Sequence, residues 1–252
     1  MLHRLEACAT LRLDFAPMHS PHTRAERKVQ RATRRQLDAL VVNIELTLVS
    51  IIQGVALSFL AESARAPLGD LRFDQWPYVA NGLLVILLFW SRSMTHTLTL
   101  IRWPLEFRHN FLYITCALIE ATIFTDLTDP LRWYAFSGAF AVAVWLLFLA
   151  DLRLIRQRQA EEVGPAEEEL YGIVLRDQII NIRLLVPGMA LFNFLAVFCI
   201  YFWPETLLRK DIHVVFAVIQ TITLLGYLIY VVRFYAYIAP IVLRANQEES
   251  TE

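Results

Sequence analysis

The residues that could do chemistry in this chain are polar side chains that interrupt long apolar stretches. Arg92 and His96 lie in the second half of the stretch 81–101, and Glu45 lies in the stretch 39–60. A charged side chain at the centre of a bilayer costs about 2.5–3.5 kcal/mol on insertion scales. We therefore expect each charge to meet an opposite charge, a water-filled cavity or the lipid head groups.

The depths of Glu45 and Arg92 predict an ion pair between them. At a helical rise of about 1.5 Å per residue, Glu45 lies ~9 Å and Arg92 ~13 Å from the same inner boundary. Antiparallel helices would bring the two charges to nearly the same level, with His96 one turn nearer the cytoplasm. The pair either locks two helices together or borders a polar cavity for an ion, a proton or a small polar solute, and the sequence leaves both readings open.

Helical spacing puts further polar residues on shared faces, because positions three or four apart lie on one side. Gln220, Thr223, Tyr227 and Tyr230 form a row in the stretch 212–237, which is either part of a polar path or a packing surface. Glu120 has no evident partner, so it either binds a proton or faces a subunit interface. The candidate residues for a polar path or ion pair are Asn43, Glu45, Gln53, Arg92, His96, Glu120, Gln220, Thr223 and Tyr227.

The first apolar stretch carries polar residues on more than one face. One stripe consists of Asn43, Thr47, Ser50, Gly54 and Ser58. Ser50 and Gly54 are small enough to let a neighbouring helix approach closely. Glu45 and Gln53 lie off this stripe, so we expect protein or water on several sides of this helix and a central place for it in the bundle.

The chain carries none of the common catalytic motifs. It lacks Gly-x-Ser-x-Gly, His-Glu-x-x-His, the P-loop, the dinucleotide fingerprint and the potassium-channel filter sequence TVGYG. His96 alone among the six histidines lies well within an apolar stretch, which argues against metal or haem ligation between helices. We expect no enzymatic activity, no cofactor and no metal, and an intramembrane enzyme is the third-ranked function.

The elements that must position these residues are six predicted transmembrane helices. The chain is 57% apolar, whereas soluble domains average about 45–50%. Each apolar stretch approaches the roughly 20 residues that cross a bilayer. The predicted spans are 39–60, 78–101, 107–126, 131–151, 183–203 and 212–237. Only Pro187 lies well inside a span, and Pro187-Gly188 marks the one plausible helix break.

The distribution of basic residues predicts that both termini are cytoplasmic. This orientation puts 18 of the 23 Lys and Arg residues on the inner side, as the positive-inside rule requires. The basic segment 1–38 is expected to lie on anionic lipid at the inner face. No nucleic-acid recognition motif accompanies that charge, so we expect no nucleic-acid partner. The predicted class is an all-α integral membrane protein with six transmembrane helices, located in a bacterial inner (plasma) membrane.

The predicted organisation follows from these spans. A helix is expected to begin near Pro165, because proline and acidic residues suit a first turn, and to continue toward the fifth span. The acidic residues 161–169 either pair with the basic N-terminal segment or are solvated. The parts are the basic segment 1–38, transmembrane helices 1–4 in 39–151, a charged cytoplasmic connection 152–182, transmembrane helices 5 and 6 in 183–237, and a cytoplasmic tail 238–252.

Two functions from different classes fit these observations. The first is an oligomeric ion channel or small-solute transporter, a homo-oligomer whose polar, cytoplasm-facing path is lined by the first, second and sixth spans. The second is a non-enzymatic membrane anchor or a signalling or effector component, which binds a cytoplasmic protein partner through its cytoplasmic segments. The polar faces within the spans support the first function, and the concentration of charge on the inner side supports the second.

Overall fold

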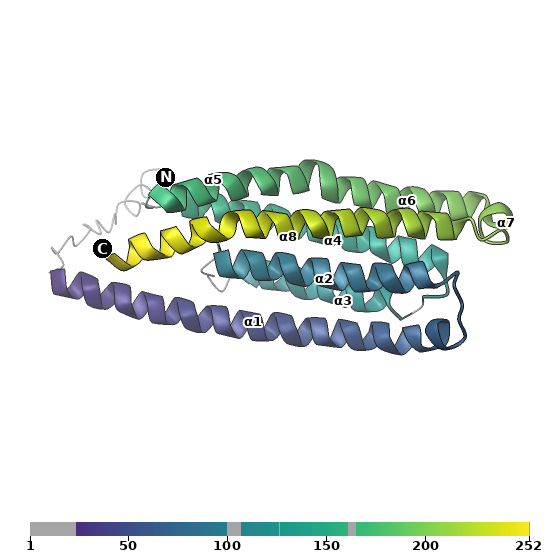
Figure 1. Ribbon diagram of the computed structural model, residues 1–252, viewed down its shortest axis with the longest axis horizontal. Coiled ribbons are helices and arrows are strands. Elements are labelled where there is room, and N and C mark those ends of the chain that lie inside the picture. The colour runs from purple at the N-terminus through teal and green to yellow at the C-terminus, as the bar shows by residue number, and fades with distance from the viewer. Residues whose placement is uncertain (1–23, 100–106, 126, 161–164, 252) are drawn as a thin grey trace, which may run out of the picture. The chain divides into compact units, whose positions relative to one another are not determined.

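The described residues of the chain form helices joined by turns, and no strand occurs among them. The computed structural model describes residues 24–99, 107–125, 127–160 and 165–251 (Figure 1). For 24–42, Glu45 and 96–99, among others, it describes the backbone alone. The helices are α1 (Arg24–Gly69), α2 (Trp76–Thr99), α3 (Phe107–Ile123), α4 (Pro130–Gln159), α5 (Pro165–Ile180), the π-helical turn η1 (Asn181–Leu185), α6 (Val186–Phe202), α7 (Pro204–Leu207) and α8 (His213–Thr251). The predicted all-helical class is confirmed for these residues.

The chain divides into two units, residues 1–37 and 38–252. Within the first unit, the described residues 24–37 are helical. The second unit holds the remaining helices and every side chain discussed below.

Five of the helices are long and apolar enough to cross a membrane, which indicates an integral membrane protein. The membrane-crossing stretches are Leu46–Gly69, Trp76–Thr95, Pro130–Gln157, Pro165–Phe202 and His213–Ala245. Their outer faces expose large apolar side chains such as Ile51, Leu191 and Ile222, as a lipid-facing surface does. Helix α3 has 17 residues and does not belong to these five. The count of six spans therefore stays a prediction.

Prolines explain where several of these helices start. Pro77, Pro130, Pro165 and Pro204 each lie in the first turn of a helix. Proline suits this position, because its missing N–H has no partner in the first turn and its φ is already helical. The helix expected to begin near Pro165 begins there.

The helices of the second unit pack in pairs that define the site. Helix α4 packs against α3 and α6, α2 packs against α8, and α5 packs against α8 and α4. Figure 1 shows α2, α3, α4, α6 and α8 lying lengthwise along one common axis. A buried aromatic cluster joins the starts of α2, α4 and α8 through Tyr78, Trp133, Tyr134 and His213.

The π-helical turn η1 joins α5 to α6 without breaking the helix. Ile180 and Val186 on either side of it both have right-handed helical backbone angles, and the Val186 N–H bonds to the carbonyl of Asn181, five residues back. Pro187 follows directly, and in a regular helix its ring would collide with the carbonyl four residues earlier. A turn that is wider by one residue relieves that collision. The sequence-based expectation of a break at Pro187 is therefore met by a local widening of the helix.

Helix α1 contacts the other helices on one face only. Val49, Gln53, Ala56 and Leu60 are buried. The stripe of Asn43, Thr47, Ser50, Gly54 and Ser58 is exposed, which differs from the predicted central place of this helix. The hydroxyl groups of Thr47, Ser50 and Ser58 donate to the carbonyl oxygen four residues back in the same helix. They need no neighbouring helix to satisfy them.

Candidate functional site

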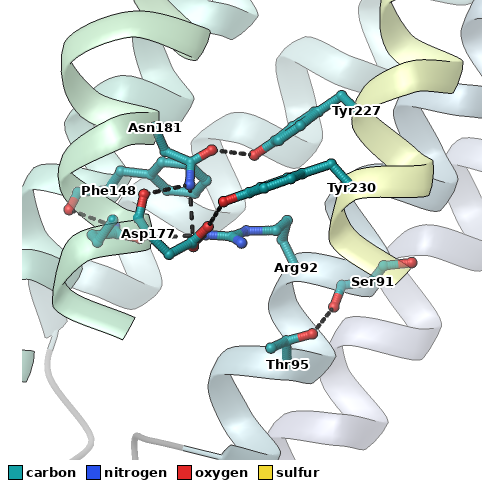
Figure 2. Close-up of polar contacts among 9 residues, drawn as sticks. Ser91, Arg92, Thr95, Phe148, Asp177, Asn181, Tyr227 and Tyr230 are labelled. Carbon is teal, nitrogen blue, oxygen red and sulfur yellow. Dashed lines mark hydrogen bonds and ion pairs between the residues drawn. The ribbon is translucent and has the colours of Figure 1, made fainter. Parts of the chain in front are cut away.

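The centre of the candidate site is a buried ion pair between Arg92 on α2 and Asp177 on α5. The Arg92 Nη2 atom lies 2.8 Å from Asp177 Oδ2, and both side chains are almost fully buried. Figure 2 shows the guanidinium group reaching from α2 toward the carboxylate. The same Nη2 atom lies 3.4 Å from Gln178 Oε1, and the guanidinium carbon lies 5.4 Å from the centre of the Phe148 ring. Arg92 therefore lies inside the bundle, as its position in the sequence requires, with an opposite charge beside it.

Further donors surround the carboxylate of Asp177. Tyr230 donates its hydroxyl to Oδ1 at 2.6 Å, and Asn181 donates its amide N–H to Oδ2 at 3.1 Å. Tyr227 in turn donates to Asn181 Oδ1 at 2.5 Å. In Figure 2 both tyrosines extend from α8 toward Asp177 and Asn181. Charge-assisted hydrogen bonds of this kind offset the cost of taking a carboxylate out of water.

The ion pair lies at one end of a large cavity inside the second unit. The cavity has a volume of about 660 Å³, and apolar side chains from α2, α4, α6 and α8 line most of it. Arg92, Tyr227 and Tyr230 form part of its wall. Cavities of roughly 300–1,000 Å³ with a few converging polar groups are typical of small-molecule sites.

A second buried polar contact lies in the wall of the same cavity. The Nε2 atom of His109, near the start of α3, lies 2.9 Å from Oδ1 of Asp151 on α4, and both side chains are buried. Asp151 follows Phe148, which contacts Arg92, by one turn of α4. The charged residues of the cavity wall therefore gather at one end, which is the end where α2 finishes and α3 begins.

The opposite end of the cavity is closed by uncharged amides. Gln220 on α8 donates to Asn193 Oδ1 at 3.2 Å, and its own Oε1 accepts from Trp133 at 3.1 Å and from Asn81 at 3.2 Å. Asn193 and Gln220 both line the cavity. The cavity thus has a charged end, an amide end and apolar walls between them.

The structure brings together some of the predicted site residues and separates others. Arg92, Gln220, Thr223 and Tyr227 all line the cavity, although Thr223 is exposed at its edge. The remaining predicted residues lie elsewhere or are not described: Gln53 and Glu120 bond to each other at 3.1 Å, Asn43 is exposed on α1, and the side chains of Glu45 and His96 lie outside the described residues. The predicted Glu45–Arg92 pair therefore stays a prediction.

Sequence reasoning missed Asp177, Asn181, His109 and Asp151. Asp177 and Asn181 fall in the segment 152–182, which the charge pattern assigns to the cytoplasm, although α5 carries them into the bundle. A usable signal was their spacing of four residues on a helix predicted to continue into the next span. His109 and Asp151 lie at the ends of predicted spans, where a polar residue draws no attention.

The described residues contain no group of three or more His, Cys, Asp and Glu that could hold a metal ion. Comparison of the chain with known proteins finds no matching family model, curated protein or solved structure. The geometry of the site can enclose an apolar body and hold a polar group at its charged end.

Proposed function

We propose that the protein is a membrane transporter for a small molecule that has an apolar body and a polar group. The observation that carries this proposal is the cavity of about 660 Å³, with the Arg92–Asp177 pair at one end and apolar walls beyond it. The apolar walls match an apolar body, and the charged end offers hydrogen bonds to a polar group.

Among the two transport functions that the sequence leaves open, the cavity walls favour a small solute over an ion. An ion loses its water on entering a narrow path, and the path must offer oxygen atoms in exchange. Between the charged end and the amide end, the wall offers mainly side chains such as Leu88, Phe89, Phe140 and Met189. These side chains have no oxygen atoms with which to replace the water around an ion.

Contacts at the starts of three helices support six membrane crossings. The hydroxyl of Tyr78, near the start of α2, lies 2.7 Å from Nδ1 of His213, the first residue of α8. Tyr134, near the start of α4, donates to the carbonyl of His213 at 3.1 Å. Since α2 and α4 start at the same level, α3 must return across the bundle between them. Its 17 described residues span ~25 Å, close to the roughly 30 Å of a hydrocarbon core.

An even number of crossings places both termini on one side, and the distribution of basic residues favours the cytoplasmic side. In this orientation the charged end of the cavity is the cytoplasmic end. The homo-oligomer and the bacterial inner membrane stay predictions, which native mass spectrometry and membrane fractionation test.

Transport can be tested in vesicles made with the full-length protein. The probe is lysophosphatidylcholine with a dithionite-reducible fluorophore on its acyl chain, present in both leaflets. Dithionite added outside bleaches the outer leaflet, and a transporter exposes the inner probe as well. We expect the protein to increase the bleached fraction, and Ala141→Phe, which fills the cavity from α4, to abolish the increase. The matched control is Val142→Phe, which adds the same ring on the exposed side of α4.

The outcomes separate the two functions that the sequence allows. Vesicles with protein that bleach no more than empty vesicles would contradict transport. If deletion of residues 1–30 abolishes the protein's effect in cells while probe movement persists in vesicles, the signalling alternative gains support.

A further inference from the structure

We infer that the cavity takes its ligand sideways from the bilayer, through a window between α6 and α8, and that the ligand is a single-chain amphiphile. The inference rests on the proposed transport function, because it takes transport as the purpose of the cavity. The binding site itself can be tested without transport.

Hydrogen bonds close the two ends of the gap between α8 and the continuous helical segment formed by α5, η1 and α6. At the charged end, Tyr230 bonds to Asp177 and Tyr227 bonds to Asn181. At the other end, Gln220 bonds to Asn193. Along α8 these two closures lie seven residues apart, from Gln220 to Tyr227, which is ~10 Å at a helical rise of about 1.5 Å per residue.

Between these closures, residues of both helices line the cavity and are exposed at the same time. On the side of η1 and α6 they are Leu184 and Gly188. On the α8 side they are Thr223 and Gly226. In a transmembrane helix, such residues connect the cavity with the lipid chains.

Two glycines leave the window open. A Cβ atom added at Gly188 or at Gly226 would meet no atom within 4 Å. The window is therefore bordered by missing side chains on both helices. Both positions are open space that an acyl chain can approach.

The two parts of the cavity suit the two parts of an amphiphile. The charged end, where Arg92 pairs with Asp177 and His109 contacts Asp151, can hold a polar head group. The apolar walls beyond it can hold one acyl chain.

Photo-crosslinking in lipid nanodiscs tests the binding site. The probe is lysophosphatidylcholine with a diazirine and an alkyne on its acyl chain, and excess unlabelled lysophosphatidylcholine defines the saturable part of the labelling. We expect saturable labelling of peptides that line the cavity, and a loss of most of it in Gly188→Phe and Gly226→Phe. Gly54→Phe is the control, because Gly54 is also exposed with no atom near an added Cβ, yet lies outside the cavity on α1.

Each outcome decides part of the inference. If Ala141→Phe removes the saturable labelling but the window variants leave it unchanged, the ligand enters by another route. That result would overturn the window. Absence of saturable labelling in the wild-type protein would overturn the site. Saturable, window-dependent labelling without probe movement in vesicles would support this inference and reject transport.

Discussion

Gln53 on α1 and Glu120 on α3 meet end to end in the interior of the bundle. The Gln53 amide nitrogen lies 3.1 Å from Glu120 Oε2, and both side chains are buried. Within the described part of the chain, the Oε1 atom of each residue has no hydrogen-bond partner. An ionised carboxylate held by one amide in an apolar setting is costly, whereas a protonated one could donate its O–H to the amide oxygen and close a second hydrogen bond. We therefore expect Glu120 to carry a proton in the folded protein.

Glu120→Gln should be tolerated much better than Glu120→Ala. Glutamine has the shape of the protonated acid and can bond to the Gln53 amide, whereas alanine leaves a buried amide without a partner, at a cost of about 1–3 kcal/mol. Thermal unfolding of the purified protein measures both, with the exposed Glu205→Gln as a control. The infrared band of a protonated carboxyl group should also disappear in Glu120→Gln. Equal destabilisation by the two substitutions would contradict the protonated pair.

Breaking the Arg92–Asp177 pair from one side should cost more than removing it whole. A buried charge left without its partner costs about 3–5 kcal/mol, while replacing both charges with apolar groups is often neutral. Arg92→Leu and Asp177→Leu should each lower the unfolding temperature strongly, and the double variant should recover part of the loss. Additive losses in the double variant would show that the two residues do not stabilise each other.

The predicted contact between Glu45 and Arg92 has a separate test. If it forms, the cost of Glu45→Gln should shrink in an Arg92→Leu background, because the charge that Glu45 faces is already gone. The measurement is the unfolding free energy of the four proteins of this double-mutant cycle. Equal costs of Glu45→Gln in the two backgrounds would leave Asp177 as the carboxylate that balances Arg92.

The two tyrosines at the charged end of the window should differ in their contribution. Tyr230 donates to a carboxylate and Tyr227 to a neutral amide. Hydrogen bonds to charged groups contribute about 1.5–3 kcal/mol and neutral ones about 0.5–1.5 kcal/mol. Tyr230→Phe should therefore destabilise more than Tyr227→Phe, and Tyr237→Phe, on an exposed face of α8, should have little effect. The reverse order would mean that Asp177 is not held mainly by Tyr230.

The sequence predicts the helices and part of the site, for separate reasons. Apolar runs and prolines locate the helices, because both act locally. The depth of Arg92 correctly requires a buried partner or a cavity for it. The partner Asp177 escapes prediction, because the surrounding segment, with exposed Arg176 and Glu169, reads as cytoplasmic. The charge pattern of a helical segment averages over all of its faces, so it conceals one buried carboxylate.

The polar stripe on α1 shows a second limit of sequence reasoning. Serine and threonine count as polar on any scale, so a stripe of them indicates a partner. Thr47 and Ser50 instead bond to their own helix. Spacing places these hydroxyls on one face, but it does not tell where their hydrogen bonds go.

The π-helical turn has a consequence for how the chain can change its length. A turn closed by a bond to the fifth residue back holds one residue more than an α-turn. An insertion in a regular helix rotates everything after it by about 100°, since a turn has about 3.6 residues. Here the wide turn absorbs the extra residue, so Asp177 before it and Asn193 after it both stay on the side of the helix that faces the bundle. Deletion of exposed Leu184 together with Pro187→Ala should therefore give a regular helix with both hydrogen-bonded closures of the window intact. The bundle can therefore accept the deletion of one residue at this position.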